Sequence, residues 1–439
     1  MQPRRWPASS VLAWLIPIAV LLGLQTVLVF REQIFSPVDE LQHVDYVRTI
    51  ALQARLPVFG DQQVDLGLVS LYFHQYPAPP TAAQLQRIGG APSYESLQFP
   101  VYYMAAAPVY KALSFDPKLA VYGVRLLNVL FSAAWLVLLI LLLRRVGVGR
   151  VPAISVSLAL TLIPGVALRD SQVINEVLVS VLVTALFILL VDRFPQRPRL
   201  HSAVEGVVFA LAVLTKLTAV ALLPVVVLAW LTRGRPQRPR FVAGATGFGL
   251  ALAPWLVWAI PVYGIPVPFV GRHPRIFHLA DFALPHGLGS WSSYLGRLVH
   301  YFWFPWEWQL PSGTWRWLDL ATLSVGSLLL VVATVWGGLH VARRRAWQSP
   351  MDRALLLSSA SLISFALAYA VFVVWLNRIW ETDFRELYLF FAPLAIALGY
   401  LALRVGPRVV SAITIGFVVL WLVADVGFYL AGTCPRCYP

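Results

Sequence analysis

The sequence is poor in cysteine and in charge. Only two cysteines occur among 439 residues, Cys434 and Cys437, so no disulfide framework holds the fold. Their spacing favours a local disulfide over redox or zinc chemistry. Charged residues form 12% of the chain and hydrophobic residues 59%, with a mean hydropathy of +0.72. Such a composition predicts an all-α polytopic membrane protein, because backbone polar groups in lipid must be satisfied within helices.

Acidic residues are also scarce, with 20 Asp and Glu against 34 Lys and Arg and a net charge of +14. The basic residues lie in short loops between apolar segments, which is the distribution that the positive-inside rule produces. We therefore expect membrane lipids as partners and no nucleic acid. The first apolar segment, 11–30, spans roughly 30 Å as a helix and lacks a small-residue cleavage site, so we expect an anchor and no cleavable signal peptide.

Eleven membrane-spanning helices are predicted, with the N-terminus inside and the C-terminus outside. Arginine-rich loops on the inner side set this orientation. The predicted spans are 11–30, 119–143, 151–168, 172–192, two within 203–232, 241–262, 318–341, 354–376, 387–403 and 409–430. The chain is expected to form one transmembrane domain over 1–439, without internal repeats, and with large external loops at 31–117 and 263–316.

Two segments allow more than one interpretation. Residues 203–232 are interrupted by Thr215-Lys216-Leu217-Thr218, which predicts two short crossings with Lys216 at the outer apex. One long tilted helix is the alternative, but it would reverse the orientation of every later span. Residues 99–115 could also cross the membrane. Because only one crossing fits between residue 31 and the arginines that follow residue 143, we interpret 99–115 as a helix lying in the interface.

Ionisable and polar residues from many elements gather on the side predicted to be external. Charge at the mouth of a membrane helix bundle usually marks a functional site. Acids beside lysine and arginine suit an anionic substrate together with a base. The candidates are Asp39, Glu40, His43, Tyr94, Glu95, Gln98, Asp170, Asn175, Glu176, Lys216, Arg378 and Arg385.

Several short motifs make the chain resemble a known superfamily. They are Pro37–His43, Tyr94–Tyr103, Val124–Asn128, Asn175-Glu176, Leu214–Thr218 and Arg385–Tyr388. In these motifs the sequence is similar to the GT-C superfamily of membrane glycosyltransferases, and especially to a bacterial family of GT-C-like membrane proteins. The resemblance extends to about residue 405. It departs from the family pattern at Phe99, at Glu176 and at Glu386.

The resemblance implies a GT-C-like bundle and a sugar transfer on the external face of a bacterial cytoplasmic membrane. The implied donor is a polyprenyl-phosphate sugar, and the acceptor is a hydroxyl of a glycan, a lipid or a protein of the cell envelope. Asp39 stands at the motif position of the general base. Lys216, Arg378 or Arg385 would stabilise the leaving phosphate, and Tyr388 belongs to the last motif. With one base, an inverting displacement is the simpler scheme.

Individual candidates keep alternative interpretations. Glu40 either supports Asp39 in catalysis or caps the helix that follows. His43 either binds a hydroxyl or phosphate or fills the loop. Arg125 lies inside a predicted span and either pairs with a buried acid or carbonyl or contacts phosphate.

The sequence establishes no cofactor, and a divalent cation is the candidate that its acidic residues suggest. Asp170 or Glu176, together with Asp39, would supply the oxygen ligands. The alternative is a salt bridge between Asp170 and the adjacent Arg169.

Two other functions remain open at this point. A transporter or flippase for lipid-linked sugar would need polar groups at the bilayer midplane and usually has repeats, whereas the charge here lies near one surface. A non-catalytic subunit of an envelope assembly complex would keep the fold without needing Asp39.

Overall fold

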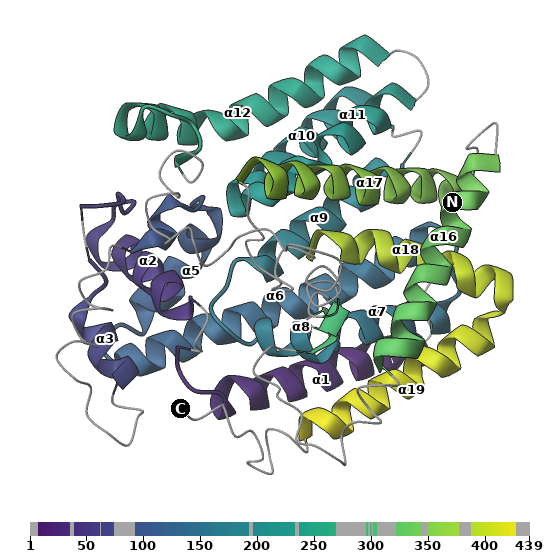
Figure 1. The fold of residues 1–439 in the computed structure, drawn as a ribbon, viewed down its shortest axis with the longest axis horizontal. Helices are drawn as coiled ribbons and strands as arrows, with labels where there is room; N and C mark the ends of the chain where they lie inside the picture. The colour runs from purple at the N-terminus through teal and green to yellow at the C-terminus, as the bar shows by residue number, and fades with distance from the viewer. Residues whose placement is uncertain are drawn as a thin grey trace.

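The computed structural model describes residues 8–35, 39–61, 63–73, 93–192, 196–232, 237–268, 296, 299–300, 302–304, 322–343, 349–376 and 388–426. The elements described there are helices (Figure 1). They are α1 (Ala8–Arg31), α2 (Glu40–Gln53), α3 (Leu66–Phe73), η1 (Tyr94–Leu97), α5 (Val101–Ala112), α6 (Pro117–Arg145), α7 (Arg150–Thr161), α8 (Pro164–Arg169), α9 (Glu176–Leu190), α10 (Pro198–Thr215), η2 (Leu217–Leu222), α11 (Leu223–Thr232), α12 (Gln237–Tyr263), η5 (Thr322–Gly326), α16 (Ser327–Arg343), α17 (Pro350–Leu376), α18 (Phe391–Val405) and α19 (Pro407–Asp425).

The all-α membrane class is confirmed. Six helices are long and apolar enough to cross a membrane, and further apolar helices are shorter. Each predicted span coincides with a helix or with a pair of short helices. The number of eleven crossings itself stays a prediction.

The span predicted at 151–168 is wrong as a single helix. It divides into α7 and α8 at residues 162–163, and Ile163 has extended backbone angles (φ −52°, ψ 127°). Pro164 is the cause, because proline disfavours the helical conformation of the preceding residue and cannot continue an α-helical hydrogen-bond ladder. Proline suits the first turn of the new helix instead.

The segment 203–232 folds as a helical hairpin. Lys216 has extended backbone angles (φ −149°, ψ 127°), so α10 ends there and the chain returns through η2 and α11. The indole of Trp230, near the end of α11, donates to Glu205, near the start of α10, at 2.9 Å. The single long helix is thereby excluded, and Lys216 lies at the apex of the hairpin.

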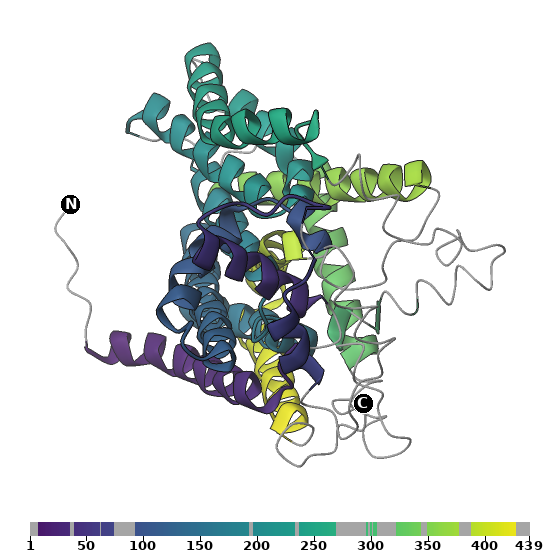
Figure 2. The ribbon, with the colours of Figure 1, turned by 90° about the vertical axis from the view of Figure 1, so that its left-hand side faces the viewer.

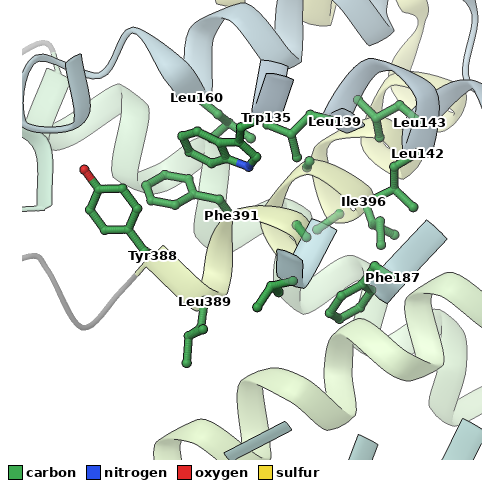
Figure 3. Packing of buried hydrophobic residues seen from close by; sticks show 14 of the residues in the cluster. Trp135, Leu139, Leu142, Leu143, Leu160, Phe187, Tyr388, Leu389, Phe391 and Ile396 are labelled. Carbon is green, nitrogen blue, oxygen red and sulfur yellow. The ribbon is translucent and has the colours of Figure 1, made fainter. Parts of the chain in front are cut away.

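The central core is built by α6, α7, α9 and α18. Trp135, Leu160, Phe187 and Phe391 are buried and pack together with the neighbouring leucines and Ile396 (Figure 3). Of the apolar window of α18, 78% is buried, against 17% for α12 and α16. The helix α18 is therefore enclosed by protein, whereas α12 and α16 lie at the periphery of the bundle (Figure 1).

Helix ends segregate to two opposite ends of the bundle. At one end α2, α3 and α5 lie together, to the left in Figure 1 and facing the viewer in Figure 2. At the other end Arg145, the last residue of α6, forms an ion pair of 2.7 Å with Asp192, which follows α9. There too Arg353, in α17, donates to the carbonyls of Leu190 and Ala229 that end α9 and α11. The C-terminal ends of α6, α9 and α11, which the sequence predicts to lie on one side of the membrane, thus lie together.

Candidate functional site

The site is organised by a buried ion pair between α6 and α2. Arg125 donates from Nε and Nη2 to the two carboxylate oxygens of Glu40, at 2.7 and 2.6 Å. Both side chains are completely buried. The backbone N–H of Val173 also donates to Glu40, at 2.8 Å. This two-pronged geometry fixes the start of α2 against α6, because the guanidinium fork matches the carboxylate.

The remaining donors of Arg125 bind the end of α1. They reach the carbonyls of Val29 (3.0 Å), Glu32 (3.1 Å) and Gln33 (2.6 Å). All five N–H donors of the guanidinium are thereby used. Of the two alternatives for Arg125, pairing with a buried acid and carbonyls is the one observed, and no donor remains for a phosphate in this arrangement.

The expectation for Glu40 changes accordingly. Its carboxylate neither faces a solvent-filled site nor caps its own helix, because the contacts with Arg125 and Val173 surround it. A catalytic role for Glu40 stays a prediction. Its observed contacts are those of a residue that holds α1, α2 and α6 together.

Asp39 is less buried than its neighbour Glu40. It lies immediately before α2 with a left-handed backbone (φ 60°, ψ −10°), a conformation that aspartate tolerates better than most residues. Its carbonyl accepts from the N–H groups of Gln42 and His43. Among the described residues, its half-buried carboxylate makes no capping bond to α2. Asp39 is therefore the N-cap residue of α2 by position, without a capping bond from its side chain.

His43 belongs to a buried hydrogen-bonded chain that joins α2, η1 and α5. The Tyr103 hydroxyl donates to Glu95 at 3.2 Å and lies 2.8 Å from Nδ1 of His43. The ring of Tyr46 stacks on Tyr103 with centroids 3.9 Å apart. Burial, followed by the negative charge of Glu95, raises the pKa of Tyr103 well above its usual value, so its proton stays in place. The chain thereby holds α2 at His43 against η1 and α5.

The motif Tyr94–Tyr103 contributes through its backbone as well as its side chains. The Tyr46 hydroxyl donates to the carbonyl of Gln98 at 3.3 Å. The side chain of Gln98 is half-buried. The side chain of Tyr94 lies outside the described residues, as do Arg378 and Arg385. The roles expected of these three side chains stay predictions.

Residues 169–176, from the last residue of α8 to the first of α9, contact most of the other parts of the site. Gln172 donates to Glu32 at 2.7 Å, and Asn128 of α6 donates to the carbonyls of Gln172 and Ile174. Asn175 donates to the carbonyl of Thr215 at 3.1 Å. This segment therefore connects the end of α1, the middle of α6 and the hairpin apex.

Asp170 lies in the same segment and is completely buried. It accepts from Ser132 at 2.7 Å and from Tyr388 at 3.1 Å. Figure 3 shows the Tyr388 hydroxyl pointing away from the aromatic cluster that holds its ring. Burial raises the pKa of Asp170 to about 7, although both hydroxyl donors act to lower it. The expected salt bridge to Arg169 is wrong, since Arg169 donates to Gln172 instead.

Lys216 lies at the apex of the hairpin and brings a basic side chain to the site. Its ammonium lies 2.9 Å from the carboxylate of Glu176, the first residue of α9. Both side chains are largely buried, at 10% and 3% exposure. Glu176 also lies near enough to Asp170, Tyr102 and Tyr103 to raise the pKa of each. The motifs that lie far apart in sequence thus converge.

A cation held by Asp39, Asp170 and Glu176 does not fit this arrangement. Among the described residues there is no cluster of three or more His, Cys, Asp or Glu side chains suited to a metal. The oxygens of Asp170 accept from hydroxyl groups, and Glu176 binds Lys216. We therefore derive no step through a metal.

Four site residues were not found from the sequence: Gln25, Glu32, Ser132 and Gln172. Gln25 donates to Ser132 at 3.0 Å in the middle of the bundle. One signal was present, because an amide within an otherwise apolar span usually faces the interior of a bundle. Glu32 and Gln172 gave no comparable signal, since both follow a helix and resemble ordinary loop residues.

Comparison with known proteins identifies the fold. No protein-family model and no curated protein matches the sequence. Among solved structures, the chain is similar to ArnT from Cupriavidus metallidurans bound to undecaprenyl phosphate, with a TM-score of 0.52, 16% identity and coverage of 92% of this chain and 62% of ArnT. It is also similar to the Archaeoglobus fulgidus oligosaccharyltransferase tethered with an acceptor peptide, with a TM-score of 0.52, 11% identity and coverage of 97% of this chain and 55% of that one.

Both of these proteins have the GT-C membrane fold, and so has this chain. The fold that the sequence motifs implied is thereby confirmed. The chain spans less than two thirds of the length of either protein. A second oligosaccharyltransferase structure, a complex with Zn and sulfate, matches with a TM-score of 0.51 and 12% identity.

Proposed function

We propose that the protein is a glycosyltransferase that moves a sugar from a polyprenyl-phosphate donor to a hydroxyl acceptor. The GT-C fold supports a transferase reaction, and ArnT, which shares the fold, was solved with undecaprenyl phosphate bound. The polar side chains that carry the proposal meet at the end of the bundle occupied by α2 and α5. A lipid-linked donor delivers its head group at such an interface.

The observation that carries the proposal is the contrast between the adjacent residues Asp39 and Glu40. Glu40 is fixed by Arg125, and the His43 chain fixes the next turn of α2. Asp39 is thereby held at a rigid helix start with a carboxylate that is half-buried and not used as a cap. A general base needs this combination of a fixed position and a proton acceptor within reach of the substrate.

In the proposed reaction the acceptor oxygen attacks the anomeric carbon of the donor sugar. The bond from that carbon to the phosphate oxygen breaks, and its electron pair leaves with polyprenyl phosphate. The acceptor proton passes to Asp39. A single displacement of this kind inverts the configuration at the anomeric carbon. Lys216 would bind the phosphate as its negative charge increases, in exchange for part of its contact with Glu176.

The direct test is sugar transfer by the purified full-length protein with a labelled undecaprenyl-phosphate sugar. Asp39→Asn keeps the shape and removes the proton acceptor, so turnover should fall by roughly two to four orders of magnitude while donor binding is kept. Asp61→Asn is the matched control, because Asp61 is an exposed carboxylate that follows α2. Near-normal turnover by Asp39→Asn would contradict the assignment and favour a lipid-linked carrier or a non-catalytic subunit.

The proposal also places the site on the external face of a bacterial cytoplasmic membrane. A single cysteine at Asp61 should then react with an impermeant reagent in intact cells, and a cysteine at Gln237 should be protected until the membrane is opened. Labelling of residue 237 from outside would reverse the topology. It would leave the chemistry of Asp39 to be tested by the transfer assay.

A further inference from the structure

At the end of the bundle opposite the proposed active site, the outer face of α16 is hollowed. A groove of about 480 Å³ is lined by Val331, Val332, Val335, Trp336, Leu339, His340 and Arg343 of α16 and by Tyr400 of α18. These α16 residues follow one face of the helix over roughly 18 Å, about half of the apolar thickness of a bilayer. The groove therefore runs along the direction of an acyl chain.

The groove changes character along its length. Val331, Val335 and Leu339 are about half exposed, and they form an apolar wall on a helix that packs little of its surface within the protein. Trp336 is 44% exposed. Aromatic side chains of this kind lie at the boundary between acyl chains and head groups. The groove is thus purely apolar from Val331 to Val335, and its aromatic and basic side chains lie between Trp336 and Arg343.

The interfacial end carries two exposed arginines. Arg343 lines the groove itself. Arg404 of α18 donates to the hydroxyl of Tyr400 at 3.1 Å and lies over its ring at 5.3 Å, which holds its guanidinium beside the groove. His340 is paired with Asp352 at 2.6 Å, so the carboxylate of Asp352 is engaged by a neighbour. Among the described residues, Arg343 and Arg404 thus supply the exposed positive charge beside the groove.

We propose that this groove binds an anionic glycerophospholipid. One acyl chain would lie along Val331, Val335 and Leu339, and the phosphate would meet Arg343 and Arg404. Basic pockets between membrane helices bind anionic lipid head groups, because the positive charge of each arginine attracts the negative phosphate. The groove lies beside α17, at the end of the bundle where Arg353 binds the last carbonyls of α9 and α11. Asp39 and Lys216 belong to the opposite end, so the two sites are separate. The proposal does not depend on the proposed reaction.

The test measures lipid retained by the full-length protein in detergent, by native mass spectrometry with dioleoyl phosphatidylglycerol and dioleoyl phosphatidylcholine. The wild-type protein should retain the anionic lipid preferentially. The double variant Arg343→Gln/Arg404→Gln should lower its affinity by about tenfold or more and remove the preference. Arg199→Gln, an exposed arginine at the start of α10, should change nothing. Equal retention of the two lipids by the wild type would overturn the proposal.

A second pair of variants tests the groove without changing charge. Val335→Trp fills the apolar wall and should lower retention of phosphatidylglycerol, whereas Leu328→Trp alters an exposed residue of α16 outside the groove and should not. Retention that is unaffected by Val335→Trp would place the lipid elsewhere. Displacement of the bound lipid by polyprenyl phosphate would assign the groove to the donor tail, and would equally overturn the proposal.

Discussion

Two buried arginines lie near opposite ends of the bundle and differ in their partners. Arg125 binds one carboxylate and three carbonyls from α1 and the segment that follows it. Arg353 binds the carbonyls of Leu190 and Ala229 and contacts the hydroxyl of Thr232 at 3.4 Å. Arg125 thus meets a full opposite charge, whereas the described contacts of Arg353 include the negative ends of two helices.

The difference separates a site from a scaffold. At the end with Arg353, the cation joins helices that already run side by side, and its contacts only reinforce their packing. At the end with Arg125, the ion pair fixes a chain segment outside any span, and Asp39 is placed by it. Several substitutions break or sharpen this contrast, and we describe them from the largest expected effect to the smallest.

Arg125→Met should have the largest effect. It leaves the Glu40 carboxylate buried without its cation, and removal of one partner of a buried pair costs about 3 to 5 kcal/mol. We expect a large drop in the thermal midpoint of the detergent-solubilised protein. The double variant Glu40→Gln/Arg125→Met should recover part of the loss, because no isolated charge remains. A double variant as unstable as Arg125→Met would mean that the carbonyl contacts of Arg125 dominate.

Asp170 should make stability depend on pH. Its folded pKa of about 7 lies above the usual value of 3.8, so the folded state binds a proton that the unfolded state has already lost. The contribution of Asp170 to the free energy of unfolding is therefore greatest below about pH 4. It falls by no more than about 4 kcal/mol as the pH rises to 7.

The check on Asp170 is the thermal midpoint measured between pH 4 and pH 8 for the wild type and for Asp170→Asn. The amide mimics the neutral acid, so this variant should lose the fall that the wild type shows. Asp61→Asn, at an exposed position, should keep it. Parallel curves for the wild type and Asp170→Asn would show that Asp170 is ionised in the folded protein.

Arg353→Met should cost less than Arg125→Met. The substitution leaves the two helix-end carbonyls that the structure describes as its acceptors without a donor, so we expect a loss of about 1 to 3 kcal/mol. Donor binding should be unchanged, because the site lies at the other end. Chemical denaturation together with a donor-binding assay separates the two quantities, and a larger loss than that of Arg125→Met would reverse the contrast.

Lys216→Ala should weaken donor binding selectively, in addition to the loss of stability caused by leaving the buried Glu176 carboxylate without its cation. We expect donor affinity to weaken by about tenfold, with partial recovery in Lys216→Arg because a planar fork replaces a point charge. Lys111→Ala, an exposed lysine of α5 at the same end, is the matched control. Unchanged donor affinity in Lys216→Ala would make the pair with Glu176 purely structural.

The sequence was sufficient to predict the structure of a segment where that structure depends on the segment's own residues. Apolar segments 11–30 and 119–143 predicted helices, and the interruption at Lys216 predicted the hairpin apex, because length and charge act locally. The pairing of Glu40 with Arg125 could not be predicted, since these residues lie 85 positions apart and only packing brings them together. The division between α7 and α8 follows from a local rule, because proline disfavours a helical conformation of the residue before it. Hydropathy does not register this rule, since 151–168 contains no charged residue.

The contacts of residues 169–176 set an order in time for the proposed active site. A membrane protein is synthesised from its N-terminus, yet Glu40 reaches its final partners only when Arg125 and Val173 have been added. Asp170, in turn, meets Tyr388 near the end of the chain. Asp39 is among the first residues to leave the ribosome and among the last to acquire a fixed position. A nascent or truncated chain would therefore hold its donor-facing residues unassembled in the membrane, and activity would report completion of the whole bundle.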